Sequence, residues 1–224
     1  MIVVDVDLTP LWLTLKVASL ATLLAFSASV GIAFLLARSR FWGKEWLDAV
    51  LTLPLVLPPT VLGYYLIVVV GRRGWIGQWW EGVFGFPLMF TWQGAVLAAA
   101  VVSFPLILKS ARAAYEGVEP NYEKAAQTLG QTELAVFLRI TLPLAWRGIL
   151  AGTLLAFARA MGEFGATLMV AGNLPGKTQT LSLAVYDAVQ AGNDGQATLL
   201  VLMTSVTCVI ILVLSAKLLK TKPL

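Results

Sequence analysis

The chain has 224 residues, of which 58% are hydrophobic and 12% are charged, and its formal net charge is +4. With a mean hydropathy of +0.83, it is far more apolar than a soluble domain, which indicates a protein that lies in a lipid bilayer. Histidine is absent and Cys208 is the single cysteine. The commonest general base and metal ligand are therefore missing, which argues against a zinc or haem site.

Five runs of the sequence are long and apolar enough to cross a membrane as helices. Crossing about 30 Å of hydrocarbon takes roughly 20 residues, and only the fourth run carries charges near its middle. We predict an all-α polytopic membrane protein that forms a single transmembrane domain over residues 1–224. The predicted spans cover about 11–37, 47–70, 92–110, 146–171 and 196–218.

Basic residues gather in alternate loops, and cytoplasmic loops of membrane proteins are enriched in Lys and Arg. The side that we assign to the cytoplasm carries Arg38, Arg40, Lys44, Lys109, Arg112, Lys124, Arg139, Arg147, Lys217, Lys220 and Lys222. The loops of the opposite side and the N-terminus carry Arg72, Arg73, Lys177, Asp5 and Asp7. We therefore predict an N-terminus outside and a C-terminus in the cytoplasm, and we interpret the basic pI as topology rather than as nucleic-acid binding.

The first two spans each contain residues that a plain membrane helix does not need. Lys16 lies near the outer end of the first span, where we expect its ammonium group to snorkel to the interface. Pro54, Pro58 and Pro59 interrupt the second span and remove backbone hydrogen bonds, which must be satisfied within protein or at a water-lined cavity. Thr60 lies beside this break. Two interpretations remain open, a kink needed only for packing and a bend or gate that lines a transport pathway.

Residues 119–143, between the third and fourth spans, favour helix but are dotted with charge. Pro120 suits the first turn of a helix, Gly130 permits a sharp turn, and Thr132 can cap a second helix. We predict a helix, an elbow and a second helix on the cytoplasmic side, joined rigidly to the fourth span. The apolar residues that recur on one face of the second helix are Leu134, Phe137 and Ile140. An amphipathic helix that rests on lipid headgroups is the alternative interpretation.

The fourth span carries Arg159 and Glu163 near its middle. Four residues apart, they would share one face of a helix and could pair. Charges at this depth are costly and usually face a bundle interior or a cavity. The pair is either a structural ion pair or part of a pathway or its gate. Gly148 and Gly152, in the same span, have the spacing that lets membrane helices pack closely.

The external loop after the fourth span contains Lys177, Thr178 and Thr180. Their polarity suits contact with an anion or with a protein that delivers one. An ordinary turn explains the same residues equally well, so both interpretations stay open.

The stretch KAAQTLGQTELAVFLRITLP resembles the cytoplasmic coupling loop in permease subunits of ABC importers. The resemblance implies that its first helix fits a groove on a nucleotide-binding subunit and passes that subunit's ATP-driven closure to the spans. Lys124 stands where the motif normally has Glu, and Glu123 lies one residue earlier, so either is a candidate for the polar contact with the partner. The residues that match the motif are Ala125, Ala126, Gly130, Ile140, Leu142 and Pro143.

The stretches LPLVLPPTVLGYYL, GRRG and ARAMGEFGATLMVAGNLPGKTQTL resemble the permease of molybdate or tungstate importers, within the sulfate/molybdate group. The resemblance implies an ABC importer permease fold, two copies of this chain, two cytoplasmic ATPase subunits and an extracytoplasmic oxyanion-binding protein, in the cytoplasmic membrane of a prokaryote. Because the phosphate-cradling pattern GxxxxGK[ST] is missing, we expect a non-catalytic subunit without a cofactor of its own. The partner ATPase would bind ATP and Mg²⁺.

A tetrahedral dianion that crosses a bilayer needs several weak contacts in place of its water shell, because a deep well would trap it. Hydroxyl groups such as that of Thr60 suit this task, and Glu163 would temper the attraction of Arg159. Molybdate, tungstate and sulfate or thiosulfate remain alternative substrates. Two other classes are an ATP-independent channel or carrier, which leaves the coupling loop unexplained, and an intramembrane enzyme, for which no catalytic constellation is present.

Overall fold

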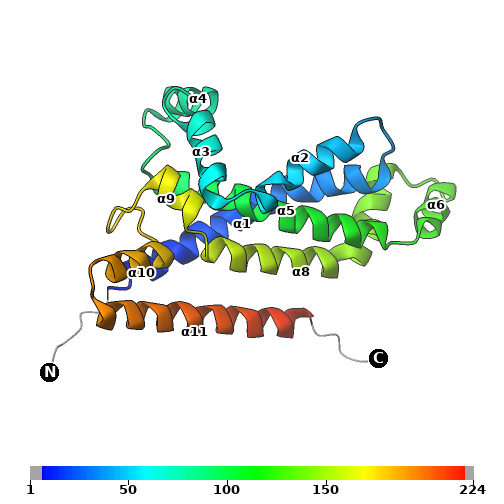
Figure 1. Cartoon of the computed structure of the whole chain (residues 1–224). Coiled ribbons are helices and arrows are strands. Elements are labelled where there is room, and N and C mark those ends of the chain that lie inside the picture. Colours follow the sequence, from blue (N-terminus) through cyan, green and yellow to red (C-terminus); the bar gives the residue numbers. More distant parts are fainter. Residues whose placement is uncertain (1–6, 220–224) are drawn as a thin grey trace.

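The computed structural model describes residues 7–219, and all regular elements within this range are helices (Figure 1). The predicted all-α class is confirmed. Asp5, Lys220 and Lys222, which entered the predicted orientation, lie outside the described residues. The elements are α1 (Thr9–Arg38), α2 (Lys44–Val56), α3 (Pro59–Val70), α4 (Trp75–Phe84), α5 (Trp92–Glu116), α6 (Pro120–Thr128), α7 (Glu133–Val136), the π-helix η1 (Phe137–Thr141), α8 (Leu142–Met161), α9 (Gly165–Ala171), α10 (Leu181–Gln190) and α11 (Asp194–Leu219).

Four described helices are long and apolar enough to span a membrane, and a bent pair makes up to five. The first, third and fifth predicted spans correspond to α1, α5 and α11, and α5 continues to Glu116, six residues beyond the predicted end. The second span differs most from a kinked helix, because α2 and α3 meet at an angle of 115°. Leu57 and Pro58 are both extended, since a residue that precedes proline is disfavoured in the α conformation.

The fourth predicted span, 146–171, is not one continuous helix, although its predicted end coincides with the end of α9 at Ala171. The helix ends at Met161 and resumes as α9 at Gly165, so Glu163 lies in a break and not on the helix that carries Arg159. Upstream, α7, η1 and α8 form one continuous helix, Glu133–Met161. The helix therefore begins within the segment predicted to be cytoplasmic.

The centre of the molecule is formed by α1, α5 and α8, which lie alongside one another (Figure 1). Their contacts are made largely by small side chains, so the helix axes can approach closely. A Cβ atom at Gly148 would lie 2.6 Å from the Cβ of Ala114, and a Cβ at Gly152 would lie closer still to the Cβ of Ser110. The predicted close packing at these two glycines is confirmed, with α5 of the same chain as the neighbour.

Large apolar side chains point outward along the long helices, as they do in a protein whose solvent is lipid. Leu23 on α1 is 62% exposed and Val209 on α11 is 59% exposed. Figure 1 shows α6 at one end of the bundle, whereas α3, α4, α9 and α10 gather toward the other. The two regions predicted to be functional are therefore separated along the bundle.

Candidate functional site

The coupling segment, residues 119–143, forms the predicted helix, elbow and second helix. At the elbow, Gly130 has φ +81°, and a Cβ placed there would meet nothing within 4 Å. The left-handed conformation alone therefore favours glycine here. The N–H groups of Gly130 and Gln131 close the end of α6 by donating to the carbonyl oxygens of Gln127 and Ala126, at 3.0 and 3.1 Å. Thr132 caps the second helix, since its Oγ1 accepts from the N–H of Ala135 at 3.3 Å.

Glu123 faces the bundle and joins three elements. Its Oε1 accepts hydrogen bonds from Arg38 Nη2 at the end of α1 and from Thr141 Oγ1 in η1, both at 2.7 Å. Arg38 Nη2 also donates to the carbonyl oxygen of Val118, at 3.2 Å. The side chains of Arg38 and Glu123 are only 23% and 16% exposed. Because Glu123 is occupied within its own chain, the exposed Lys124 is the one of the two candidates that points to the outside.

The π-helical turn η1 brings Thr141 to Glu123. The N–H of Leu142 bonds to the carbonyl oxygen of Phe137, five residues earlier. Pro143 follows and has no N–H to donate, so the widened turn lies where the ordinary helical pattern is interrupted. Thr141 is fully buried as a result, whereas Pro143 itself is exposed.

The predicted apolar face of the second helix is only partly correct. Leu134 is 68% exposed, and Val136, which the pattern did not include, is buried. Phe137 packs against Phe34 of α1 and Tyr115 of α5, with ring centroids 4.6 and 6.0 Å apart. This aromatic cluster lies beside the polar network of Glu123. It fixes the start of the long helix against α1 and α5.

The outward face of α6 presents Tyr122, Lys124, Ala125 and Leu129. Tyr122 is 56% and Leu129 is 81% exposed. Of the two matched alanines, Ala125 points outward and Ala126 is buried against the rest of the chain. The face therefore combines apolar side chains, one small residue and one cation on a helix whose opposite side is fixed by hydrogen bonds. A surface of this kind can receive a partner and pass on its displacement.

A second candidate region is the helix-break crossing, where the break at Leu57–Pro59 meets the break at Gly162–Gly165. A Cβ at Gly165 would lie 2.6 Å from the Cβ of Pro59. Further along the same contact, a Cβ at Gly63 would lie 2.7 Å from the Cβ of Met169. The structure thus brings two predicted groups together that are about a hundred residues apart in the chain. Pro58, Pro59 and Thr60 stay exposed in the single chain.

Arg159 and Glu163 form the predicted ion pair, but with a different geometry. Arg159 Nη1 lies 2.8 Å from Glu163 Oε2, with the guanidinium side chain 36% exposed and the carboxylate side chain 2% exposed. Glu163 Oε1 accepts from the N–H of Ala166 at 2.8 Å, so the same carboxylate caps α9. A buried carboxylate is tolerated when it is paired and hydrogen-bonded in this way. The pair holds the break together and leaves part of Arg159 open to the surroundings.

The loop predicted to be external supports the interpretation as an ordinary turn. Thr178 is fully buried, and its hydroxyl donates to the carbonyl oxygen of Gly172 and accepts from the N–H of Leu174. Thr180 is 4% exposed, and the start of α10 is capped by Thr14 of α1, whose Oγ1 accepts from Leu181 N–H at 2.8 Å. Of the three predicted residues, Lys177 alone is exposed.

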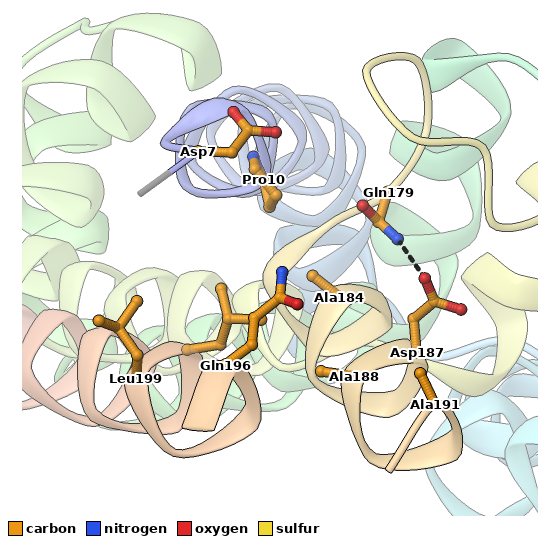
Figure 2. A pocket seen from close by; sticks show the side chains of 10 residues that line it. Asp7, Pro10, Gln179, Ala184, Asp187, Ala188, Ala191, Gln196 and Leu199 are labelled. Carbon is orange, nitrogen blue, oxygen red and sulfur yellow. Dashed lines mark hydrogen bonds between the residues drawn. The ribbon is translucent and has the colours of Figure 1, made fainter. Parts of the chain in front are cut away.

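A small cavity of about 120 Å³ lies beside that loop, between the start of α1, α10 and α11 (Figure 2). Asp7 and Asp187 line it, and Gln179 Nε2 donates to Asp187 Oδ2 at 3.3 Å. Hydrogen bonds from the side chain and the backbone of Thr9 lower the pKa of Asp7, which keeps this carboxylate charged. Two carboxylates make the cavity unsuitable for an oxyanion.

Several contacts of the coupling segment are not among the predictions from the sequence, in which Arg38 is a topological charge and Thr141 is not a candidate residue. A further network joins α2 to α5, where Asp48 pairs with Lys109 and Arg112. Arg112 also pairs with Glu116, at 2.8 Å. The signal that the sequence offers for Asp48 is its position, since an acidic residue at the margin of a predicted span needs a partner. Nothing local in the sequence indicates the pairing of Arg38 with Glu123.

Comparison with known proteins gives consistent matches. The family model described as the inner membrane component of binding-protein-dependent transport systems matches residues 29–221. The chain is 47% identical over 215 residues to the molybdenum transport system permease protein of Escherichia coli strain K12, covering 95% of this chain and 94% of that protein. It is 44% identical over 210 residues to the protein of the same name from Haemophilus influenzae, covering 93% and 92%.

Among solved structures, a chain of the methionine ABC transporter in an inward-facing conformation matches with a TM-score of 0.75. The identity is 15%, and the match covers 94% of this chain and 93% of that chain. At this identity the likeness concerns the arrangement of the helices.

Proposed function

Because the chain belongs to the family of inner membrane components of binding-protein-dependent transport systems, we propose that it is the membrane-spanning subunit of an ATP-driven molybdate importer. Two relatives that are more than 40% identical over nearly their whole length are named molybdenum transport system permeases. They support molybdate over sulfate as the substrate. Tungstate, which shares the charge and the tetrahedral shape of molybdate, stays an alternative within the same class.

The observation that carries the coupling role is the geometry of α6. Its outward face is open and partly apolar, whereas Glu123 fixes its inward face to α1 and to the start of the long helix Glu133–Met161. A partner that displaces α6 would therefore move both helices with it, because the hydrogen bonds of Glu123 leave little independent motion between them. We propose that the partner is a cytoplasmic ATPase that binds ATP and Mg²⁺ and carries out the hydrolysis.

The assembly would contain two copies of this chain, two ATPase subunits and an extracytoplasmic binding protein that delivers the oxyanion. The orientation that fits this arrangement has the N-terminus outside and α6 in the cytoplasm. The described basic residues Arg38, Lys109 and Arg112 lie on the helix ends that face α6, as cytoplasmic placement requires. ATP binding would open the pathway outward, and hydrolysis would reset it.

We place the pathway at the helix-break crossing. Arg159 offers a partly exposed guanidinium whose charge is offset by Glu163 at 2.8 Å, so it attracts an anion without holding it tightly. Thr60 adds an exposed hydroxyl beside Pro58 and Pro59. Lys177 is the remaining external candidate for contact with the anion or its binding protein.

The test of this function is the elemental content of cells with and without this chain, grown in trace molybdate and tungstate with excess sulfate. We expect molybdenum or tungsten to fall when the chain is missing, and excess sulfate not to reproduce this fall. Unchanged metal content together with impaired sulfate uptake would overturn the substrate and leave the coupling role intact. An ATPase that does not co-purify with the gently solubilised chain would instead support an ATP-independent channel or carrier.

A further inference from the structure

An open groove of about 590 Å³ lies where α1 and α5 begin, at the end of the bundle away from α6. Its walls include four aromatic side chains, among them Trp12 and Trp92, and two lysines, Lys16 and Lys177. Trp side chains are enriched at the level of lipid headgroups. We call this feature the headgroup groove.

The described lining residues of the groove include two lysines and no Asp or Glu. Asp7 is not part of the lining, but its Oδ1 accepts from the N–H of the lining residue Thr9 at 2.8 Å. Lys16 Nζ lies 3.6 Å above the centre of the Trp92 ring, which holds this ammonium group at the level where α5 begins. The predicted orientation assigns four basic residues to this side of the membrane, Lys16, Arg72, Arg73 and Lys177. The groove gathers Lys16 and Lys177, whereas Arg72 and Arg73 are not among its lining residues. The ligand that this chemistry favours is an anion.

Phe90 forms part of the groove in a strained conformation. Its φ is +60°, a backbone conformation that residues other than glycine rarely adopt. The N–H of Phe90 donates to the carbonyl oxygen of Val170 at 3.1 Å, and its ring lies against Gly172. These contacts hold a 61% exposed aromatic ring at the groove.

A second cavity, of about 290 Å³, lies deeper along the same helices and has apolar walls. It runs between α1, α2 and α5 and is lined by Leu24, Ala28, Pro54, Leu97 and Phe104 among others. We call it the apolar crevice. A cavity of this composition suits an alkyl chain and offers a free oxyanion nothing.

The two cavities follow one face of each helix. On α1, Lys16, Leu20, Leu24 and Ala28 are each four residues apart, and on α5 Leu97 follows Gln93 by four, so each set lies on one side of its helix. Leu20 and Leu24 are 38% and 49% exposed. At a rise of 1.5 Å per residue, the crevice begins about 12 Å below the lysine. The order from the end of the bundle inward is aromatic ring, cation and alkyl surface, which is the order of a phospholipid.

We propose that the headgroup groove and the apolar crevice bind one anionic phospholipid, with its phosphate at Lys16 and Lys177 and an acyl chain in the crevice. The bound lipid would fill the surface between α1, α2 and α5 in the leaflet where α1 begins. This site lies apart from the helix-break crossing and from the coupling segment, and Lys177 is the one residue that it shares with the proposed transport function. Lys16 and the apolar crevice therefore test the lipid separately from the transported anion.

The test uses the purified complex with its partner subunits, equilibrated with equal amounts of phosphatidylglycerol and phosphatidylcholine, and counts retained lipids by native mass spectrometry. We expect phosphatidylglycerol to be retained preferentially. Lys16→Gln and Lys177→Gln should each lower its retention about fivefold, since a lysine near anionic lipid contributes on the order of 1 kcal/mol. Arg73→Gln removes a basic residue outside the groove and is the matched control, with retention expected to be unchanged.

Ala28→Trp separates the lipid from a free anion. Ala28 is exposed and lines the crevice, so the indole ring would fill the space proposed for the acyl chain and reduce retention of phosphatidylglycerol. Inorganic phosphate should not displace the lipid. Equal retention of the two lipids, or lysine variants that match Arg73→Gln, would overturn the proposal. Displacement by inorganic phosphate with no effect of Ala28→Trp would mean that the groove takes a free oxyanion. Molybdenum uptake, measured in parallel, tests the proposed function separately.

Discussion

The coupling segment and the helix-break crossing solve the same problem, the joining of helix ends, by opposite means. In the coupling segment, polar groups make the joint, since Glu123 accepts from Arg38 and Thr141. At the crossing, apolar side chains packed on glycines make it, because Pro59 lies against Gly165 and Met169 against Gly63. Directional hydrogen bonds fix orientation, whereas an apolar contact over a glycine permits sliding. The comparison suggests that the coupling segment moves as a rigid body and that the crossing is where the relative motion occurs.

The largest effect should come from the one place where the crossing relies on charge. Arg159→Leu would leave the buried carboxylate of Glu163 without its partner, at a cost of roughly 3–5 kcal/mol for an unpaired buried charge. Thermal unfolding of the purified complex in detergent should show a large fall in melting temperature. Arg159→Lys keeps a positive charge for Glu163 and should lose much less. Equal losses in the two variants would contradict the ion pair as the main contribution.

The next effect concerns the glycine contact itself. Gly165→Leu places a side chain where Pro59 already lies, and overpacking of this kind costs about 1–3 kcal/mol. Because α3 and α9 would be pushed apart, molybdenum uptake should fall further than the loss of folded protein explains. The control is Gly31→Leu, since a Cβ at Gly31 meets nothing within 4 Å. If Gly165→Leu transports normally, the crossing is not the site of the motion.

The Glu123 network should contribute less than the buried pair at Glu163, because it is partly exposed and so partly screened. Glu123→Gln, Arg38→Gln and the double variant form a cycle from which the coupling energy is obtained by thermal unfolding. We expect about 1 kcal/mol between the two sites. Uptake should fall in each single variant while ATP hydrolysis continues, since α6 would move without carrying α1. Arg40→Gln, two residues from Arg38 and exposed, is the control for charge alone.

The two regions also differ in how far the sequence predicted them. The elbow at Gly130 and the cap at Thr132 were predicted correctly, because both follow from the conformation of a few neighbouring residues. The inward orientation of Glu123 could not be predicted, since its partner Arg38 is 85 residues away in the sequence. The break within the fourth predicted span was not foreseen, because Arg159 and Glu163 have helical spacing. That spacing conceals that Glu163 uses its second oxygen to start a new helix.

The class of protein was predictable for a different reason. The number of membrane helices can be predicted from hydrophobic runs, because in lipid each spanning segment must satisfy its backbone hydrogen bonds internally, as a helix does. The ABC importer permease fold and the molybdate permease resemblance are supported by the matched family and relatives. The crossing of two breaks was not predictable, since each proline and glycine has an ordinary explanation when its contact partner is unknown.

The smallest effect on stability should accompany a clear effect on assembly. Leu129 is 81% exposed on the outward face of α6. Leu129→Glu should therefore change the free energy of unfolding by no more than about 0.5 kcal/mol, and the melting temperature should shift little. If that face receives the ATPase, a carboxylate there must be desolvated on binding, and the amount of ATPase that co-purifies should fall severalfold. Leu144→Glu is the control, because Leu144 is also exposed, at 55%, but lies beyond the coupling segment. Co-purification that is equal in the two variants would separate the face of α6 from partner binding, and the rigid contacts of Glu123 would then need another purpose.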